Sequence, residues 1–99
     1  MSNAVVYISF SLIEGASVSD FLLAAEKLNS EFMSQQNGYI SWKLLVEGDT
    51  WADVLTWETM EAAQNAMEAG CSYPLSGEYF SFLNQESVKT HMYSIKTSN

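Results

Sequence analysis

The stretch between residues 39 and 57 restricts the possible folds of this chain most strongly, because it has the pattern of two strands joined by a tight turn. Gly48 and Asp49 are predicted to form that turn, since glycine reaches positive φ without a Cβ clash and Asp tolerates it better than most residues. Pairing outward from the turn predicts the register of the hairpin. The predicted cross-strand pairs are Glu47 with Thr50, Val46 with Trp51, Leu44 with Asp53, Trp42 with Leu55 and Ile40 with Trp57.

This register gathers large apolar side chains on one side of the hairpin, because successive residues of a strand point to opposite faces. Asp53 is the single charged residue that interrupts the large apolar face. That face is predicted to hold Ile40, Trp42, Leu44, Val46, Trp51, Leu55 and Trp57. The opposite face is predicted to hold Tyr39, Ser41, Lys43, Leu45, Ala52, Val54 and Thr56.

The rest of the chain divides into alternating strand and helix patterns. The pattern predicts a first strand over 4–12 and a first helix that ends at Asn37-Gly38. It also predicts a second helix over about 58–69, a short helix over 75–83 and a last strand over 88–95. Ser17 or Ser19 is placed to cap the first helix. The inner stripe of that helix is predicted to be Phe21, Ala25, Leu28 and Phe32, widened by Leu22 and Met33.

The order of these elements is that of a split β-α-β arrangement, the ferredoxin-like α+β fold, in one domain over 4–96. It predicts a four-stranded antiparallel sheet in the order 4-1-3-2 with the helices on one face. The uncovered face would then expose an apolar patch that monomers rarely tolerate, which predicts a homodimer packed sheet against sheet. The alternative is a monomer with one partly polar, solvated face.

The charge composition disfavours several classes of partner. The chain carries 12 acidic and 4 basic residues, for a net charge of −8. This disfavours nucleic acid and anionic membrane surfaces, which attract clustered positive charge. Cys71 is the only cysteine, and no apolar run is long enough to span a bilayer, so we expect a cytoplasmic protein. Neither clustered metal ligands nor a glycine-rich phosphate loop is visible, so no metal or cofactor is expected.

The chain resembles the dimeric α/β-barrel superfamily, the group around the antibiotic biosynthesis monooxygenase domain. The resemblance depends on the ferredoxin-like order, on the junction Trp57-Glu58-Thr59 that runs directly into a helix, and on an aromatic-rich short helix before the last strand. It implies a dimeric barrel and, for some members, cofactor-independent oxidation of phenolic or quinol-like aromatics. The haem-degrading members use a histidine after the second helix, where this chain has Ala69-Gly70-Cys71-Ser72, so haem chemistry is not expected.

Two residues are candidates for proton transfer. His91 is the only histidine, and its unperturbed pKa lies near neutrality, which suits a general base. Asp53 lies on the large apolar face, where a carboxylate must be paired, protonated or near water. The structural alternatives are a solvated edge-strand histidine and an aspartate that simply reaches solvent near the turn.

Four aromatic residues are candidates for ligand binding. Trp42 and Trp57 could line a flat apolar cavity, and Tyr7 and Tyr93 could supply hydroxyl groups to it. Tryptophans in such a stripe more often serve as core or dimer packing. The predicted function is therefore a homodimer that binds a small apolar or aromatic molecule, with cofactor-free oxidation as its activity. The alternative is a non-catalytic ligand-binding or dimerisation module.

Overall fold

A computed structural model describes residues 3–98 of the chain. The described chain alternates strands and helices in the predicted order, with short 3-10 turns beside α1 and before β4. The elements are β1 (Ala4–Phe10), α1 (Val18–Glu31), η1 (Met33–Gln35), β2 (Tyr39–Glu47), β3 (Thr50–Trp57), α2 (Met60–Gly70), α3 (Pro74–Phe80), η2 (Gln85–Ser87) and β4 (Lys89–Ser94).

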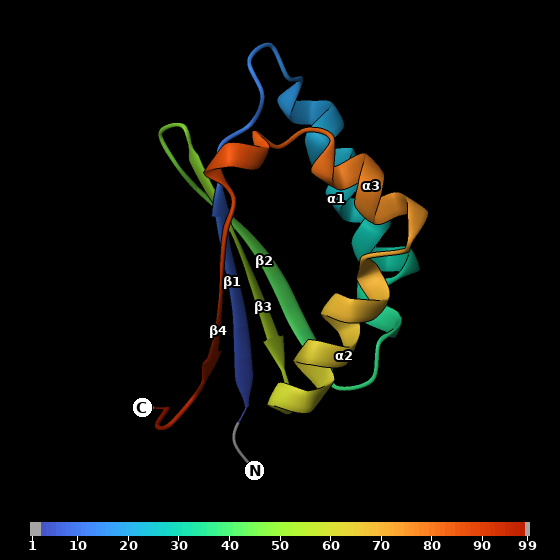
Figure 1. Cartoon of the computed structure of the whole chain (residues 1–99), viewed down its shortest axis with the longest axis vertical. Helices are drawn as coiled ribbons and strands as arrows, with labels where there is room; N and C mark the ends of the chain where they lie inside the picture. The colour runs from blue at the N-terminus through green and yellow to red at the C-terminus, as the bar shows by residue number, and fades with distance from the viewer. Residues whose placement is uncertain (1–2, 99) are drawn as a thin grey trace.

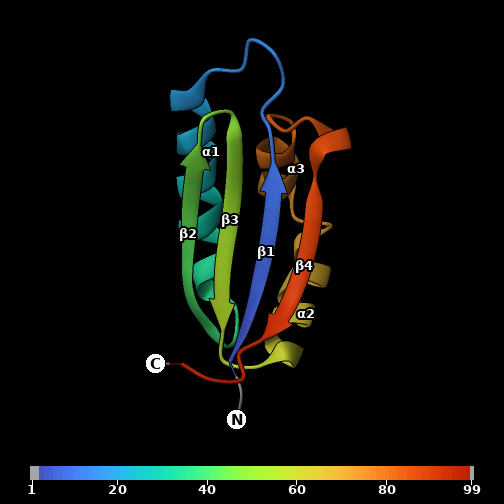
Figure 2. The same cartoon turned by 90° about the vertical axis from the view of Figure 1, so that its left-hand side faces the viewer.

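The four strands form one antiparallel sheet in the order β2-β3-β1-β4, which is the predicted order 4-1-3-2 counted from the other edge. The α-helices all pack on the same side of this sheet (Figure 1). Turned by 90°, the molecule presents the opposite face of the sheet with the helices behind it (Figure 2). Within residues 3–98 no helix covers that face, which we call the open face. The predicted ferredoxin-like architecture is confirmed.

The tight turn of the central hairpin depends on one glycine. Gly48 has a φ of +59°, whereas Asp49 does not adopt a positive φ. The left-handed position therefore falls on the residue without a Cβ, and Asp49 avoids the strain that a positive φ would impose on it. Outward from this turn the predicted register holds as far as the pairing of Trp42 with Leu55.

The far end of the hairpin differs from the prediction. A bulge between Tyr39 and Ser41 shifts the register by one residue, so Tyr39 rather than Ile40 pairs with Trp57. The extra residue of a bulge is left unpaired and reverses the alternation of side chains beyond it. As a result Tyr39 faces the helices, packs edge-on to Trp57 at 5.8 Å and donates a hydrogen bond to Asn29 Oδ1, while Ile40 is exposed.

Helix α1 begins where its capping serine predicts. The Oγ atom of Ser17 accepts a hydrogen bond from the backbone N–H of Asp20, at 3.3 Å. The helix ends at Glu31, earlier than predicted, and the chain continues through η1 before it reaches Gly38. Leu22 was expected in the buried stripe but is exposed, because it lies to one side of the stripe that faces the sheet. The buried stripe consists of Phe21, Ala25, Leu28, Phe32 and Met33.

Helix α2 approaches the sheet closely because the residues at the contact are small. Gly38 has a φ of +82°, and a Cβ built on it would come within 2.6 Å of the Cβ of Ala62. Thr59 caps the helix by accepting a bond from the Ala62 N–H at 3.0 Å. Ala63 and Ala66 are buried on the inner side of α2.

Helix α3 completes the cover of the sheet. It begins at Pro74, whose fixed φ suits a first helical position, and it buries Ser76 and Tyr79. The core thus lies between the sheet and the helices. Its buried apolar residues from β1 and β3 are Ala4, Val6, Ile8, Phe10, Leu55 and Trp57.

Candidate functional site

A carboxylate is buried at the centre of the covered face of the sheet. Asp53 lies in β3 opposite Ile8 of β1 and Leu44 of β2, and only 2% of its surface is exposed. Its predicted place on the large apolar face is confirmed. A buried carboxylate is costly unless it is hydrogen-bonded, so the groups around Asp53 decide what it can do.

Two side chains donate hydrogen bonds to this carboxylate. The indole N–H of Trp42 donates at 3.0 Å and the hydroxyl of Tyr79 donates at 2.6 Å. Both bonds go to the same oxygen, Oδ1. Among residues 3–98 no side chain or backbone group donates to Oδ2, so this second oxygen is the one left to interact with a ligand.

The two donors reach Asp53 from different parts of the sequence. Trp42 stands diagonally across the hairpin, where long side chains of neighbouring strands meet. Tyr79 comes from α3, and its ring stacks on Phe21 at 5.2 Å and packs edge-on to Trp42 at 5.5 Å. Aromatic contacts of this kind hold the ring in one orientation, so the hydroxyl stays directed at the carboxylate.

Burial changes the acidity of both hydrogen-bonded groups. Removal from water raises the pKa of Asp53 to about 6, although the bonds from Tyr79 and Trp42 lower it in part. Burial and the neighbouring Asp53 charge raise the pKa of Tyr79 well above its ordinary value, so its hydroxyl stays protonated and donates. A carboxyl group whose pKa lies near neutrality suits general acid–base catalysis.

A mainly apolar cavity of about 230 Å³ adjoins Asp53 between the sheet and helices α2 and α3. This volume is below the roughly 300–1,000 Å³ of pockets for drug-sized ligands, so it fits a smaller molecule. We call it the Asp53 cavity. Its walls are formed by Ile8, Leu28, Met33, Trp42, Asp53, Leu55, Met67, Gly70, Cys71, Ser76, Tyr79, Phe80, Thr90 and Met92.

The exposed residues of the lining mark the mouth of the cavity. Cys71, Phe80 and Thr90 are exposed, whereas Asp53 and Tyr79 are buried. The mouth therefore lies between β4 and the junction of α2 with α3, and the carboxylate lies at the inner end. A ligand that enters this way leaves water behind before it reaches Asp53.

The predicted aromatic residues divide between the cavity and the core. Trp42 lines the cavity, as expected for a ligand-binding residue. Trp57 is fully buried and is not among the lining residues. No group within residues 3–98 accepts a hydrogen bond from its indole Nε1 atom. Trp57 therefore packs in the core beside the cavity, which agrees with the packing interpretation of the tryptophan stripe.

Three other predicted site residues lie on the open face. His91 is paired with Tyr7 across β1 and β4, and its ring stacks on Tyr93 at 5.9 Å. The same alternation turns Thr90 and Met92 toward the cavity. Within one chain the sheet therefore separates His91, Tyr7 and Tyr93 from Asp53 and its cavity. Their roles as site residues stay predictions.

Sequence reasoning missed two polar residues of the cavity. Tyr79 was not among the predicted site residues, yet it makes the shorter of the two bonds to Asp53. Ser76 lines the cavity and was not singled out at all. Both lie on α3 at a spacing of three residues, which places them on one face of a helix. That spacing is the only signal in the sequence, and it required knowledge that α3 faces Asp53.

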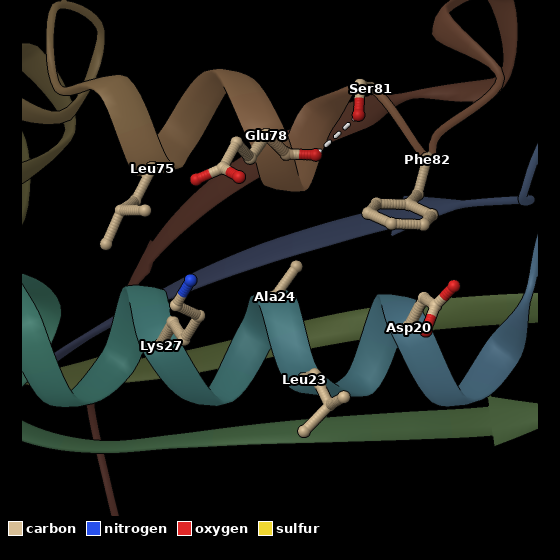
Figure 3. A pocket seen from close by; sticks show the side chains of 8 residues that line it. All are labelled: Asp20, Leu23, Ala24, Lys27, Leu75, Glu78, Ser81 and Phe82. Atoms are coloured by element: carbon tan, nitrogen blue, oxygen red, sulfur yellow. Dashed lines mark hydrogen bonds between the residues drawn. The ribbon is translucent and has the colours of Figure 1, made fainter.

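A second, larger groove of about 430 Å³ lies between α1 and α3 on the outer surface (Figure 3). Its charged residues Asp20, Lys27 and Glu78 are all exposed. Because water surrounds these groups, the groove offers no shielded reactive group like Asp53. Within residues 3–98 no helix is long and apolar enough to cross a membrane. In the same part of the chain, no three His, Cys, Asp or Glu residues cluster as metal ligands.

Comparison with solved structures identifies the fold as one found in oxygenases. SnoaB, a cofactor-independent oxygenase from Streptomyces nogalater, matches with a TM-score of 0.79 over 99% of this chain and 97% of that chain, at 13% identity. A proposed antibiotic biosynthesis monooxygenase from Nitrosomonas europaea matches with a TM-score of 0.72 over 95% and 90% of the two chains, at 12% identity. A similar protein from Bacillus cereus matches with a TM-score of 0.64 over 100% and 98%, at 18% identity.

No family model and no curated protein matches the sequence. At such low identities the structural matches establish the fold alone. The chain has the fold of the antibiotic biosynthesis monooxygenase proteins that it matches, as its resemblance to that group predicted.

Proposed function

We propose that this protein binds a small aromatic molecule with an acidic hydroxyl group in the Asp53 cavity and oxidises it with O2 without a cofactor. The observation that carries the proposal is the buried carboxylate at the inner end of an apolar cavity, with one oxygen left without a hydrogen bond. SnoaB, which is described as a cofactor-independent oxygenase, has the same fold and supports this reaction class.

The proposed chemistry needs one proton acceptor and a shielded cavity. A substrate hydroxyl gives its proton to Asp53 Oδ2, and the resulting anion transfers an electron to O2. The substrate radical and superoxide then combine at a ring carbon. One oxygen atom stays on that carbon. The other leaves as water, which takes up the two electrons and two protons released when the hydroxyl-bearing ring is oxidised to a quinone. The apolar walls exclude water, which would otherwise stabilise the substrate anion before it reacts and quench the radical intermediates.

The same fold leaves an apolar face to be covered. The open face exposes Tyr7, Leu45 and Tyr93, and Val54 lies half-buried at its centre. Although the chain as a whole is strongly acidic, this face carries Lys43 on β2 and Lys89 on β4, at opposite edges of the sheet. The proposed partner for this face is a second copy of the chain, packed sheet against sheet.

Oxygen uptake with naphthohydroquinone tests the proposed reaction. The expected product is hydroxynaphthoquinone with one atom from isotopically labelled O2, and water takes up the other atom. Asp53→Asn is expected to lower the rate by roughly 100-fold or more, as loss of a general base does. His91→Ala is expected to retain turnover, because His91 lies on the other face of the sheet.

Two other outcomes would change the assignment. Binding of naphthohydroquinone without uptake of O2 above its spontaneous oxidation would identify a non-catalytic binding module. Loss of turnover in His91→Ala with retention in Asp53→Asn would move the proton acceptor to the open face. The rate is also expected to fall as the pH drops below about 6, since Asp53 then becomes protonated.

A further inference from the structure

A serine at one wall of the Asp53 cavity has no hydrogen-bond partner. Ser76 is 4% exposed and lines the cavity, and no group within residues 3–98 bonds to its Oγ atom. An unpaired buried hydroxyl destabilises a folded chain, so such groups are uncommon in native structures. A ligand in the cavity is the natural source of the missing partner.

Other serines of this chain show how easily such a hydroxyl is satisfied. Serines in helices commonly bond to a backbone carbonyl of the preceding turn. Ser81 donates to the Glu78 carbonyl at 2.6 Å, and Ser30 donates to the Lys27 carbonyl at 3.4 Å. Ser76 makes no such bond although it lies in α3. Its hydroxyl is therefore available in the cavity wall rather than used by its own helix.

The neighbouring glycine leaves space beside this hydroxyl. Gly70 also lines the cavity, and a Cβ built on it would lie 3.7 Å from Ser76 Oγ. With no side chain at this position, a ligand atom can approach the hydroxyl. Ser76 also lies one helical turn from Tyr79, which marks the Asp53 end of the cavity. The cavity thus offers polar groups at two separate points on otherwise mainly apolar walls.

We infer that Ser76 is a second polar anchor of the Asp53 cavity, and that the ligand is an aromatic molecule with oxygen at both ends. One end is a hydroxyl that faces Asp53 Oδ2, and the other is a carbonyl or hydroxyl oxygen that faces Ser76. This inference rests on the proposed function, since it assumes a ligand at Asp53, and it narrows the substrate class from phenols in general to quinol-like and hydroxy-carbonyl aromatics.

The second anchor also has a chemical role. When Asp53 Oδ2 takes the proton of the ligand hydroxyl, the negative charge spreads through the ring to a conjugated carbonyl oxygen at the far end. A hydroxyl that donates to this oxygen stabilises the anion more than the neutral ligand, because the bond becomes charge-assisted. Ser76 is thus expected to favour the ionised ligand, the form that reacts with O2.

Binding of a matched pair of probes to the full chain tests the inference. Para-hydroxyacetophenone has a hydroxyl and a carbonyl at opposite ends, whereas para-ethylphenol has nearly the same shape and lacks the carbonyl. Calorimetry is expected to show roughly tenfold tighter binding of para-hydroxyacetophenone to the wild type. Ser76→Ala should reduce this preference to within about twofold. Ser72→Ala, an exposed serine outside the cavity, should retain it.

The absorption spectrum gives a second readout that a merely structural role would not change. The para-hydroxyacetophenone anion absorbs at longer wavelength than the neutral form, and Ser76→Ala is expected to lower the fraction of anion in the bound probe. Equal binding of both probes to the wild type, or a preference that survives in Ser76→Ala, would overturn the role of Ser76 and leave the proposed function intact. Failure of both probes to bind would count against the proposed function itself.

Discussion

The two faces of the sheet are built from alternate residues of the same strands, yet they differ in kind. The covered face holds a buried carboxylate among aromatic rings, with a cavity beside it. The open face holds the only histidine of the chain next to exposed tyrosines, and within residues 3–98 nothing packs on it. A shift of one residue along a strand is enough to move a side chain from one setting to the other.

The two faces have the features of two different kinds of surface, a reaction site and a packing surface, which the sequence pattern alone does not separate. The covered face has the features of a reaction site: low exposure, a raised pKa at Asp53 and a donor in Tyr79. The open face has the features of a packing surface, because its apolar residues are spread over all four strands. The helices therefore bury a titratable carboxylate on one face, and the other face is the one proposed to bind a second chain.

The largest effect is expected from a charge at the centre of the open face. Val54 lies between Tyr7 and Lys43 on neighbouring strands. Val54→Lys would place an unpaired charge in the proposed dimer interface, and we expect it to abolish dimerisation at micromolar concentration. Leu23→Lys changes an exposed residue of α1 and should leave the dimer intact. Light scattering that gives the mass of one chain for the wild type, or of two for Val54→Lys, would contradict the dimer.

The next effect concerns the pH dependence of stability on the covered face. The pKa of Asp53 is raised from 3.8 to about 6 on folding, so between these values the folded state binds more protons than the unfolded state. The free energy of unfolding is therefore highest below about pH 4 and falls by about 3 kcal/mol as the pH rises through 6. Asp53→Asn should lose this dependence.

Urea unfolding from pH 4 to 8 at one protein concentration, followed by tryptophan fluorescence, would measure this change. Asp49→Asn provides the control, since Asp49 lies in the exposed turn of the hairpin. If the free energy of unfolding depends on pH in the same way in wild type and Asp53→Asn, Asp53 does not titrate as a buried group. The two faces would then not differ in this electrostatic property.

The smallest effect is expected at the inner wall of the cavity. Gly70→Ala would place a methyl group at ordinary contact distances, 3.6 Å from Phe32 and 3.7 Å from Ser76. We expect it to raise stability by roughly 0.5–1 kcal/mol, as alanine does in a helix, and to weaken binding of para-hydroxyacetophenone severalfold by filling space beside Ser76. Gly77→Ala, in α3 with open space around it, should share the first effect and not the second. Equal binding by both variants would show that the ligand does not reach Ser76.

Much of the fold could be predicted from local patterns. The pairing of Leu44 with Asp53 followed from the Gly48 turn, and the start of α1 followed from Ser17, because each depends on neighbours in sequence. The pairing of Ile40 with Trp57 was wrong because simple alternation does not foresee a bulge. The candidate site was predicted only in part, since alternation placed Asp53 and Trp42 together but could not show which face of the hairpin meets the helices.

By itself the sequence determined the strand and helix order, the side of the hairpin that carries Asp53, and the presence of apolar residues on both faces of the hairpin. Only the tertiary structure decided that Tyr79 and Ser76 meet Asp53 around one cavity and that His91 does not. The reason is physical: hydrogen bonds and side-chain alternation act between neighbours along the chain or across a turn, whereas burial of Asp53 depends on how α3 packs over the sheet.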